Sequence, residues 1–190
     1  VTDTWLVVGL GNPGPTYAFT RHNIGARVIE ALAKNANVTL SKHKRAQAHV
    51  AEIRLNGKHV VIAQPTSFMN ESGGPTKALV SFYKVEPENI IVLHDELDID
   101  LGTIRVKFSG GDNGHNGLKS IRKSLSTGDW YRIRLGIGRP PGQQDPADFV
   151  LKNFSSGEQA EVTDLIERGA EAVEHLVSTS LEETQNRFNS

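Results

Sequence analysis

The sequence contains no cysteine in its 190 residues. This absence excludes disulfide bonds, thiolate metal sites and cysteine nucleophiles. It also fits a protein that works in a reducing compartment. Any catalytic or metal chemistry must therefore come from histidine, carboxylate, amide or hydroxyl side chains.

Long apolar runs are also missing. No segment approaches the roughly 20 apolar residues of a membrane-spanning helix, and no basic segment followed by an apolar one opens the chain. We therefore expect a soluble, cytoplasmic protein with no membrane partner. At 190 residues with 37% hydrophobic content, the chain can bury one core, which predicts a single domain over residues 1–190.

The net charge is only −1, but it is unevenly distributed along the chain. Residues 103–139 contain eight basic and two acidic residues, a balance of +6. Residues 151–190 contain three basic and eight acidic residues, a balance of −5. This pattern predicts one face that meets a polyanion and one that does not. Chance clustering on a solvated surface is the alternative.

Hydrophobic periodicity predicts alternating strands and helices. The expected strands are 5–10, 48–55, 59–64, 89–94, 103–108 and 131–137, and the expected helices are 22–35, 75–84, 116–125 and 157–177. Asn56-Gly57 between two alternating segments is a strong hairpin signal. Residues 139–147, rich in Pro and Gly, are predicted to form a mobile loop. Together these elements indicate a compact α/β domain, with a mixed β-sheet flanked by helices.

The first predicted strand runs into a glycine pattern that is also found in dinucleotide-binding folds. Gly9, Gly11 and Gly14 have the G-x-G-x-x-G spacing. In a dinucleotide site, however, the helix begins within the glycines, so that its free amides face the pyrophosphate. Here Pro13 and Pro15 remove two amide donors, and the helical pattern starts only near residue 21. The sequence therefore argues against a nucleotide cofactor.

Polar side chains follow several predicted strands at the point where each one ends. Asn12 follows strand 5–10, Asn70 follows strand 59–64, Asp95 follows strand 89–94, and Asn116 lies in the loop after strand 103–108. Several strand ends that converge on one edge of a sheet make a cleft. Singly, each residue has a structural explanation as a turn, cap or loop residue. Their recurrence at successive element ends favours a site.

This set of residues suits hydrolysis of an acyl bond by activated water. The ordinary pKa of histidine lies near neutrality, so His22 can take a proton from water while Asp95 orients its ring. The amides of Asn12, Asn70 and Asn116 can hold amide and carbonyl groups of a substrate. A serine nucleophile is disfavoured because the G-x-S-x-G motif is absent.

Metal-dependent hydrolysis is the competing chemistry. The candidate ligands are His22, His94, Asp95, Glu96 and His115. The H-E-x-x-H motif is absent, and adjacent side chains on a strand point to opposite faces, so residues 94–96 cannot all converge on one ion. We expect no metal and no cofactor.

Five segments stand out along the chain, namely GLGNPG at 9–14, TRHNIG at 20–25, PTSFMNESG at 65–73, HDELD at 94–98 and GHNGL at 114–118. With these five segments in this order, the chain resembles the bacterial-type peptidyl-tRNA hydrolases. The similarity continues through RIRLGIGRP at 132–140 and DFVL at 148–151. The first few residues and the tail after about residue 178 are expected to lie outside it.

The resemblance implies a role for each matching residue. His22 would be the catalytic base and Asp95 its orienting partner, with Asn12 in the same catalytic group. The substrate site would comprise Tyr17, Phe68, Met69, Asn70, His115 and Asn116, with Asn70 and Asn116 contacting the peptide main chain. Lys107 and Arg134 resemble the clamp for the tRNA 5′-phosphate, although Arg132 lies on the same strand face as Arg134. Arg139 and a lid around 140–146 are further expectations.

The resemblance also implies an activity. Members of the family hydrolyse the ester that joins a peptide to the terminal ribose of tRNA, without metal or cofactor, and recycle tRNA from aborted translation. The implied fold is a single α/β domain, usually monomeric. Two alternatives remain: a catalytically silent RNA-binding module, which separation of His22 from Asp95 would favour, and a metal-dependent peptidase.

Overall fold

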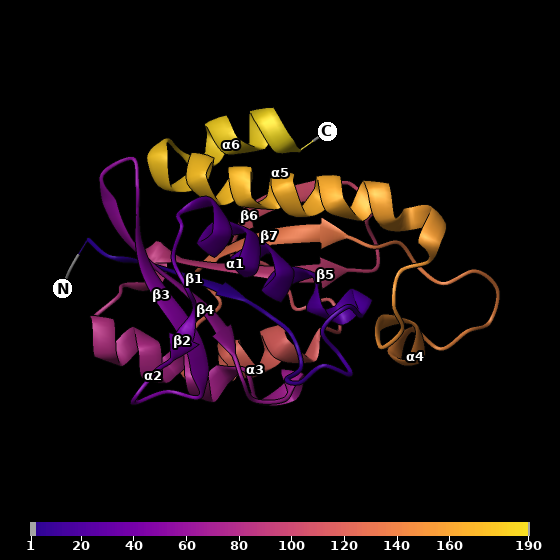
Figure 1. Ribbon diagram of the computed structural model, residues 1–190, viewed down its shortest axis with the longest axis horizontal. Helices are drawn as coiled ribbons and strands as arrows, with labels where there is room; N and C mark the ends of the chain where they lie inside the picture. Colours follow the sequence, from indigo (N-terminus) through magenta and orange to yellow (C-terminus); the bar gives the residue numbers. More distant parts are fainter. Residues whose placement is uncertain (1–2, 190) are drawn as a thin grey trace.

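A computed structural model describes residues 3–189, and one seven-stranded sheet runs through it (Figure 1). The strand order is β2-β3-β4-β1-β5-β7-β6. The strands are β1 (Trp5–Gly9), β2 (Ser41–Lys42), β3 (Ala48–Leu55), β4 (Lys58–Pro65), β5 (Ile90–Glu96), β6 (Ile104–Phe108) and β7 (Tyr131–Gly136). The four central strands β4, β1, β5 and β7 are parallel, and β2, β3 and β6 pair antiparallel. The predicted mixed sheet is confirmed.

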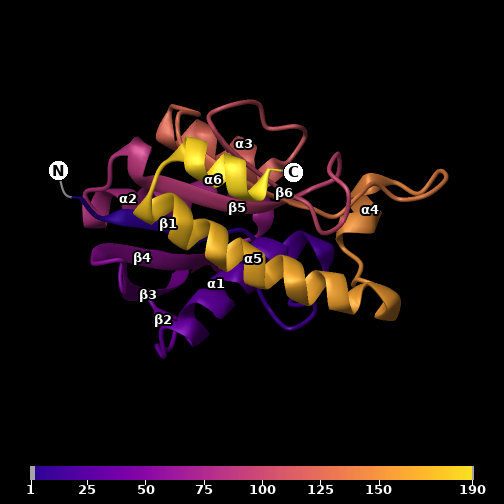
Figure 2. The same cartoon turned by 90° about the horizontal axis from the view of Figure 1, so that it is seen from above.

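Helices cover both faces of the sheet (Figures 1 and 2). One face carries α1 (Ile24–Asn35), α5 (Gln159–Ser178) and α6 (Leu181–Phe188), and the other carries α2 (Gly73–Tyr83) and α3 (Asn116–Leu125). A short helix, α4 (Pro146–Val150), lies beyond the end of the sheet. Within residues 3–189, no helix is both long enough and apolar enough to cross a membrane.

Two apolar layers hold the helices on the sheet, and β1 contributes to both. Val7 packs in the layer under α1 and α5, whereas Leu6 and Val8 pack in the layer under α2 and α3. Successive strand residues face opposite sides, so a strand that is covered on both faces must be apolar throughout. This explains the unbroken apolar run from residue 5 to residue 8.

The predicted elements occur with shifts of a few residues at their ends. Asn56 and Gly57 both have positive φ, at 50° and 79°, as the predicted two-residue hairpin turn requires. Strand β5 continues to Glu96, so Asp95 lies within the end of the strand rather than after it. Among the strands and α-helices within residues 3–189, β2, α4 and α6 were not predicted, and α4 begins inside the segment expected to be a mobile loop.

Glycines at the first strand–helix crossing serve close packing. A Cβ on Gly9 would lie 2.2 Å from the Gly25 carbonyl oxygen, and a Cβ on Gly25 would lie 2.3 Å from the Leu93 carbonyl oxygen. Helix α1 therefore lies directly on β1 and β5. It begins at Ile24, well after Gly14, which confirms that no helix starts within the glycine pattern.

Asn116 lies at the carboxyl edge of the sheet, as expected, but it does not reach this edge through the end of β6. Strand β6 is antiparallel to β7, and its last residue, Phe108, pairs with the first residue of β7, Tyr131. Strand β6 therefore ends at the amino edge of the parallel strands. Asn116 reaches the carboxyl edge only because the loop 109–115 returns to it before α3 begins.

The C-terminal helix closes the exposed edge of the sheet. The Val106 amide donates to Asn189 Oδ1 at 2.7 Å, and Gln185 Nε2 donates to the Val106 carbonyl at 3.0 Å. These side chains satisfy backbone groups of an edge strand that would otherwise be open to pairing with another chain.

Candidate active site

A cleft of about 600 Å³ lies at the carboxyl edge of the parallel strands. Loops after β1 and β4, the end of β5 and the start of α3 bring polar side chains into it, as expected for an α/β sheet. Nine of the predicted site residues line it, namely Asn12, Tyr17, His22, Phe68, Met69, Asn70, Asp95, His115 and Asn116. The other two, Lys107 and Arg134, line a separate pocket.

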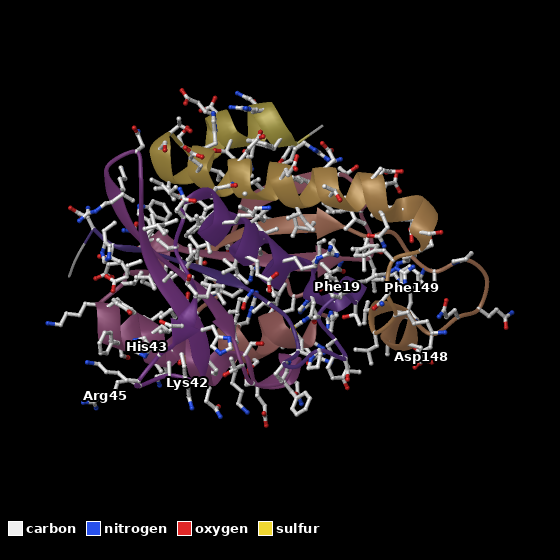
Figure 3. All side chains as sticks on the ribbon, in the orientation of Figure 1. Phe19, Lys42, His43, Arg45, Asp148 and Phe149 are labelled. Atoms are coloured by element: carbon white, nitrogen blue, oxygen red, sulfur yellow. The ribbon has the colours of Figure 1, made fainter. Side chains whose placement is uncertain are left out.

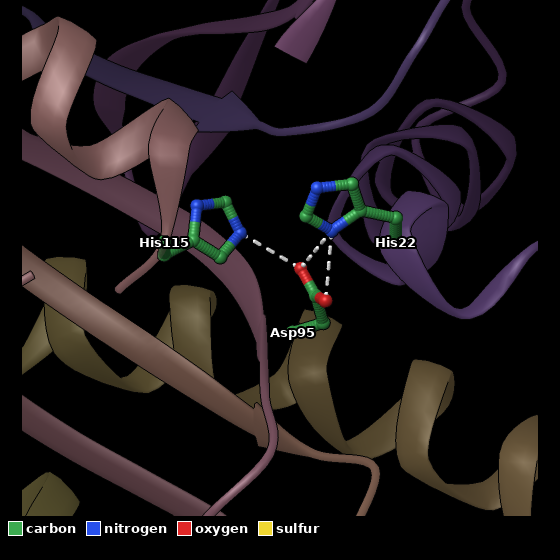
Figure 4. A group of neighbouring side chains, drawn as sticks. All are labelled: His22, Asp95 and His115. Carbon is green, nitrogen blue, oxygen red and sulfur yellow. Dashed lines mark hydrogen bonds and ion pairs between the residues drawn. The ribbon is translucent and has the colours of Figure 1, made fainter. Parts of the chain in front are cut away.

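A carboxylate shared by two histidines lies at the base of the cleft. His22 Nδ1 lies 2.8 Å from Asp95 Oδ2 and 3.0 Å from Asp95 Oδ1, and His115 Nε2 lies 2.8 Å from Asp95 Oδ1. Figure 4 shows both rings directed at this carboxylate from different elements. His22 and Asp95 are thus in contact. Their separation would have favoured a catalytically silent RNA-binding module, and the two residues are not separated.

Hydrogen bonds define the proton positions on both rings. His115 caps α3, and its Nδ1 accepts from the amides of Gly117 at 3.1 Å and Leu118 at 3.3 Å. That nitrogen carries no proton, so Nε2 must carry the proton donated to Asp95. In neutral His22, Nδ1 donates to Asp95, which leaves Nε2 as an unprotonated base.

The charges in this group perturb its pKa values. Burial alone would lower the pKa of His22, but the Asp95 charge and hydrogen bond outweigh it and raise the pKa above 6.5. Burial opposes ionisation of Asp95, yet the two histidines hold its pKa well below the usual range. Asp95 therefore remains ionised throughout the pH range in which His22 gains and loses its proton.

His94 belongs to the structure behind this group. Burial first and the neighbouring His115 second lower the pKa of His94 to about 3, so its ring is neutral. Its Nδ1 donates to the Asp95 carbonyl at 2.8 Å. The side chain therefore supports the backbone that carries Asp95.

The amide of Asn12 is oriented by its neighbours. The Met69 amide donates to Asn12 Oδ1 at 2.7 Å, which leaves Nδ2 as the group available to the cleft. The Asn23 side chain holds the Asn12 backbone through two bonds of 2.9 Å. Sequence reasoning missed Asn23, although it lies within the same TRHNIG segment as His22.

The remaining residues form the walls of the cleft. Tyr17 and Phe68 make an edge-to-face aromatic pair with ring centres 6.5 Å apart, and Phe68 is 53% exposed. Met69 is buried beneath the cleft. Asn70 and Asn116 are exposed where the loop after β4 meets α3, so their amides are accessible to a ligand.

Three of the residues that were weighed as possible metal ligands do come together. The donor atoms of His22, Asp95 and His115 all lie within 4.8 Å of one another, a set that could hold an ion. Glu96, next along the strand, instead pairs with Arg134. Residues 94–96 therefore do not converge, as their alternation along the strand predicts.

A second pocket, of about 350 Å³, contains the two residues that were expected to form a phosphate clamp. Lys107, Arg132 and Arg134 all line it, because β6 and β7 pair Lys107 directly with Arg132 and place Arg134 on the same face. Arg134 donates to the buried Glu96 through Nε at 3.2 Å and Nη2 at 3.0 Å. Lys107 and Arg134 are thus neighbours, but Arg134 already has a carboxylate partner.

Arg132 is a further cation of this pocket. Its guanidinium carbon lies 3.9 Å above the Trp130 ring centre, and its Nε and Nη2 have no hydrogen-bond partner within residues 3–189. Burial, followed by the charge of Arg122, lowers the pKa of Arg132 to about 10, which still leaves it charged at neutral pH. The two-residue spacing of Arg132 and Arg134 already indicated that they share one face of the strand. Only the sheet register shows that Arg132 lies opposite Lys107.

Loop residues connect the pocket to the mouth of the cleft. Asn113 Nδ2 donates to Glu96 Oε2 and to Asp98 Oδ2, each at 2.7 Å, and Arg139 forms an ion pair with Asp98. Arg139, Pro146 and Ala147 line the cleft, so the expected lid segment does border the site.

Comparison with known proteins agrees with this geometry. The sequence model of the peptidyl-tRNA hydrolase family matches residues 6–190, so the tail after residue 178 belongs to the matched region, contrary to expectation. Proteins named peptidyl-tRNA hydrolase from Frankia alni and Streptomyces coelicolor are 55% and 53% identical, over 97% and 98% of this chain and 93% and 95% of theirs.

Solved structures agree as well. The crystal structure of peptidyl-tRNA hydrolase from Acinetobacter baumannii superposes with a TM-score of 0.92 at 35% identity, and the match covers 100% of this chain and 96% of that one. A 5′-methylthioadenosine nucleosidase from Arabidopsis thaliana, 9% identical with a TM-score of 0.55, shares the fold alone. The chain belongs to the peptidyl-tRNA hydrolase family.

Proposed function

We propose that this chain hydrolyses the ester between a peptide, or an N-acyl-amino acid, and the 3′ ribose of tRNA, and so recycles tRNA from aborted translation. The observation that carries the proposal is the 2.8 Å contact between His22 Nδ1 and Asp95, which leaves His22 Nε2 as a base in the cleft. Membership of the family supplies the substrate class.

The proposed reaction uses His22 twice. Nε2 takes a proton from water as the water oxygen attacks the ester carbonyl carbon. The resulting imidazolium is stabilised by Asp95 and then gives its proton to the ribose oxygen as the carbon–oxygen bond breaks. The products are a peptide with a free carboxyl group and tRNA with a free 3′ hydroxyl.

Asn12 is the proposed stabiliser of the intermediate. Its Oδ1 is occupied by the Met69 amide, so only Nδ2 can donate toward negative charge on the substrate oxygen. Donors that are oriented before the reaction stabilise such charge effectively, because they need not reorganise.

Asn70 and Asn116 are the proposed contacts to the peptide main chain. Their amides can pair with an amide N–H and a carbonyl of the acyl group. A free aminoacyl-tRNA presents a charged amino group instead of that amide, so it should be a poor substrate.

Lys107 and Arg134 are proposed to hold a phosphate of the tRNA, with Arg132 as a third cation in the same pocket. Because the proposed substrate is made by ribosomes, the site of action would be the cytoplasm. A monomer is sufficient for this function, since every proposed residue comes from one chain.

The decisive experiment measures release of N-acetylated amino acid from tRNA. Wild-type protein should release it with or without a chelator, and His22→Ala should lower kcat by about 10²–10⁴-fold, the usual contribution of a positioned acid–base group. Activity that a chelator abolishes and zinc restores would instead favour a metal-dependent hydrolase. Near-normal turnover by His22→Ala would exclude the proposed mechanism.

A further inference from the structure

A second large groove, of about 1200 Å³, runs between α2 and α3 on the outer surface. Four cations and one carboxylate line it, namely Arg45, Lys77, Lys119, Lys123 and Glu71. Figure 3 shows Arg45 projecting from the molecule beside α2. We call this feature the basic groove.

The cations of the basic groove are available to a ligand. Lys77, Lys119 and Lys123 are exposed, and none of the four cations forms an ion pair within residues 3–189. The phosphate clamp differs, because Arg134 there is paired with Glu96. The basic groove therefore carries positive charge that the fold itself does not use.

The basic groove continues directly from the active-site cleft. Asn70 and Asn116 line both cavities and form the junction between them. The phosphate clamp lies on the other side of α3, in the pocket over β6 and β7. An ester held beside His22 would thus extend its RNA toward the clamp and its peptide, past the two asparagines, toward the basic groove.

The length of α3 relates positions in the groove to positions in the peptide. Lys123 lies seven residues beyond Asn116, or about 10 Å at 1.5 Å per residue. An extended peptide advances about 3.3 Å per residue, so about three further residues cover this distance. If Asn116 contacts the first or second residue from the ester, the fourth and fifth residues lie near Lys123 and Lys77.

We propose that the basic groove binds the upstream part of the peptide and favours acidic side chains about four and five residues from the ester. This inference rests on the proposed function, because it assumes that a peptidyl-tRNA occupies the cleft. Gly74 leaves room for the peptide, since a Cβ there would meet no atom within 4 Å.

The test compares peptidyl-tRNAs that share one tRNA and differ only in the peptide. N-acetylated hexapeptides carry Glu, Gln or Lys at both the fourth and fifth positions from the ester, and N-acetylaminoacyl-tRNA is the short reference. Wild-type kcat/KM should follow the order Glu, Gln, Lys, with a spread of roughly 2- to 10-fold, the scale of one or two exposed ion pairs. Added salt should reduce the spread.

The charge-reversed variant Lys77→Glu/Lys123→Glu should reverse this order and leave the short reference unchanged. Lys34→Glu/Lys58→Glu changes the net charge equally at exposed sites outside the groove, and it should retain the wild-type order. Gly74→Leu, which fills the groove without altering its charge, should slow all hexapeptides and spare the short reference.

Three results would overturn the proposal. One is the same kcat/KM for Glu and Lys hexapeptides with the wild-type protein. Another is an equal loss of kcat/KM with every substrate, including the short reference, in the Lys77→Glu/Lys123→Glu variant, since this would place RNA in the groove. The third is the same reversal of the hexapeptide order in the control variant Lys34→Glu/Lys58→Glu. Failure of the wild-type protein to hydrolyse even the short reference would instead refute the proposed function, and this inference with it.

Discussion

Asp95 accepts hydrogen bonds from two histidines, and the different surroundings of their rings give them different roles. His115 meets Asp95 only through Nε2, because two amides of α3 occupy its Nδ1. His22 has no such restraint on Nε2, so it can gain and lose a proton while Asp95 stays ionised. We therefore propose that His115 acts mainly by positioning Asp95, rather than by contacting the substrate as the family resemblance implies.

The raised pKa of His22 predicts the pH dependence of the reaction. Hydrolysis needs the neutral ring, and the neutral fraction grows as the pH rises through the pKa, so kcat/KM should rise along an acidic limb centred above pH 6.5. Asp95→Asn removes the charge that raises this pKa and leaves the opposing effect of burial. The limb should move to lower pH and the plateau should fall by roughly 10- to 10³-fold. A pH–rate profile with an unmoved limb would contradict this account.

Close packing of α1 on the sheet decides where His22 lies, because the ring is carried on the turn that enters this helix. Gly25→Ala would bring a Cβ to within 2.3 Å of the Leu93 carbonyl, where backbone atoms on both sides must shift. We expect a loss of stability of about 1–3 kcal/mol, with a fall in Tm of about 2–12 °C, and a lower kcat. Gly74→Ala is the matched control, since Gly74 is also the second residue of its helix but faces open space. Equal Tm values for the two variants would contradict the prediction.

Lys107 and Arg134, the two residues proposed as the phosphate clamp, have different structural roles in the β6–β7 pair. Arg134→Ala would leave the buried carboxylate of Glu96, a residue that is only 5% exposed, without its guanidinium partner, which should lower stability by about 1–3 kcal/mol. Lys107→Ala leaves no buried carboxylate behind and should change the Tm little. Both variants should raise KM for full-length tRNA substrates with kcat nearly unchanged. Melting curves and steady-state kinetics on the two variants test this, and the same Tm for both would refute the distinction.

At the scale of the whole molecule, charge is separated across the sheet. The basic side chains of β6 and β7 face the α3 side, because the alternate residues Ile104, Val106, Ile133 and Leu135 pack under α1 and α5. The acidic C-terminal helices α5 and α6 cover the opposite face. A chain with a net charge of −1 can therefore present a positive surface to RNA.

This separation predicts how substrate binding responds to salt. The slope of log KM against log salt concentration reports the number of phosphate contacts, and loss of one contact to duplex RNA should flatten it by about 0.9. Lys107→Ala should show this change with full-length tRNA and none with a short acyl-nucleotide. Glu182→Gln, an exposed change on α6, should leave the slope unchanged. If the two variants alter the slope equally, the tRNA does not bind at the β6–β7 face.

Local patterns in the chain were sufficient to predict most of the elements. The apolar runs of β1 and β5, the Asn56-Gly57 turn and the 3.6-residue period of α3 each depend on residues close together in sequence. The short elements β2, α4 and α6 were not predicted, because they depend on contacts between residues that are far apart in sequence. Helix α6, with only Thr184 and Phe188 buried, is held mainly by contacts with β6 and α5 that no local pattern reveals.

The sequence by itself determined most of the element types, the family and nine of the residues that line the cleft, because motifs and periodicity are local properties. Tertiary structure alone decided which partners those residues have. The direction of β6, the meeting of Arg132 with Lys107, the pairing of Arg134 with Glu96 and the sharing of Asp95 by two histidines all depend on register and on loops between distant segments. Among these pairs, His22 and Asp95 lie 73 positions apart, and spacing along the chain does not encode such contacts.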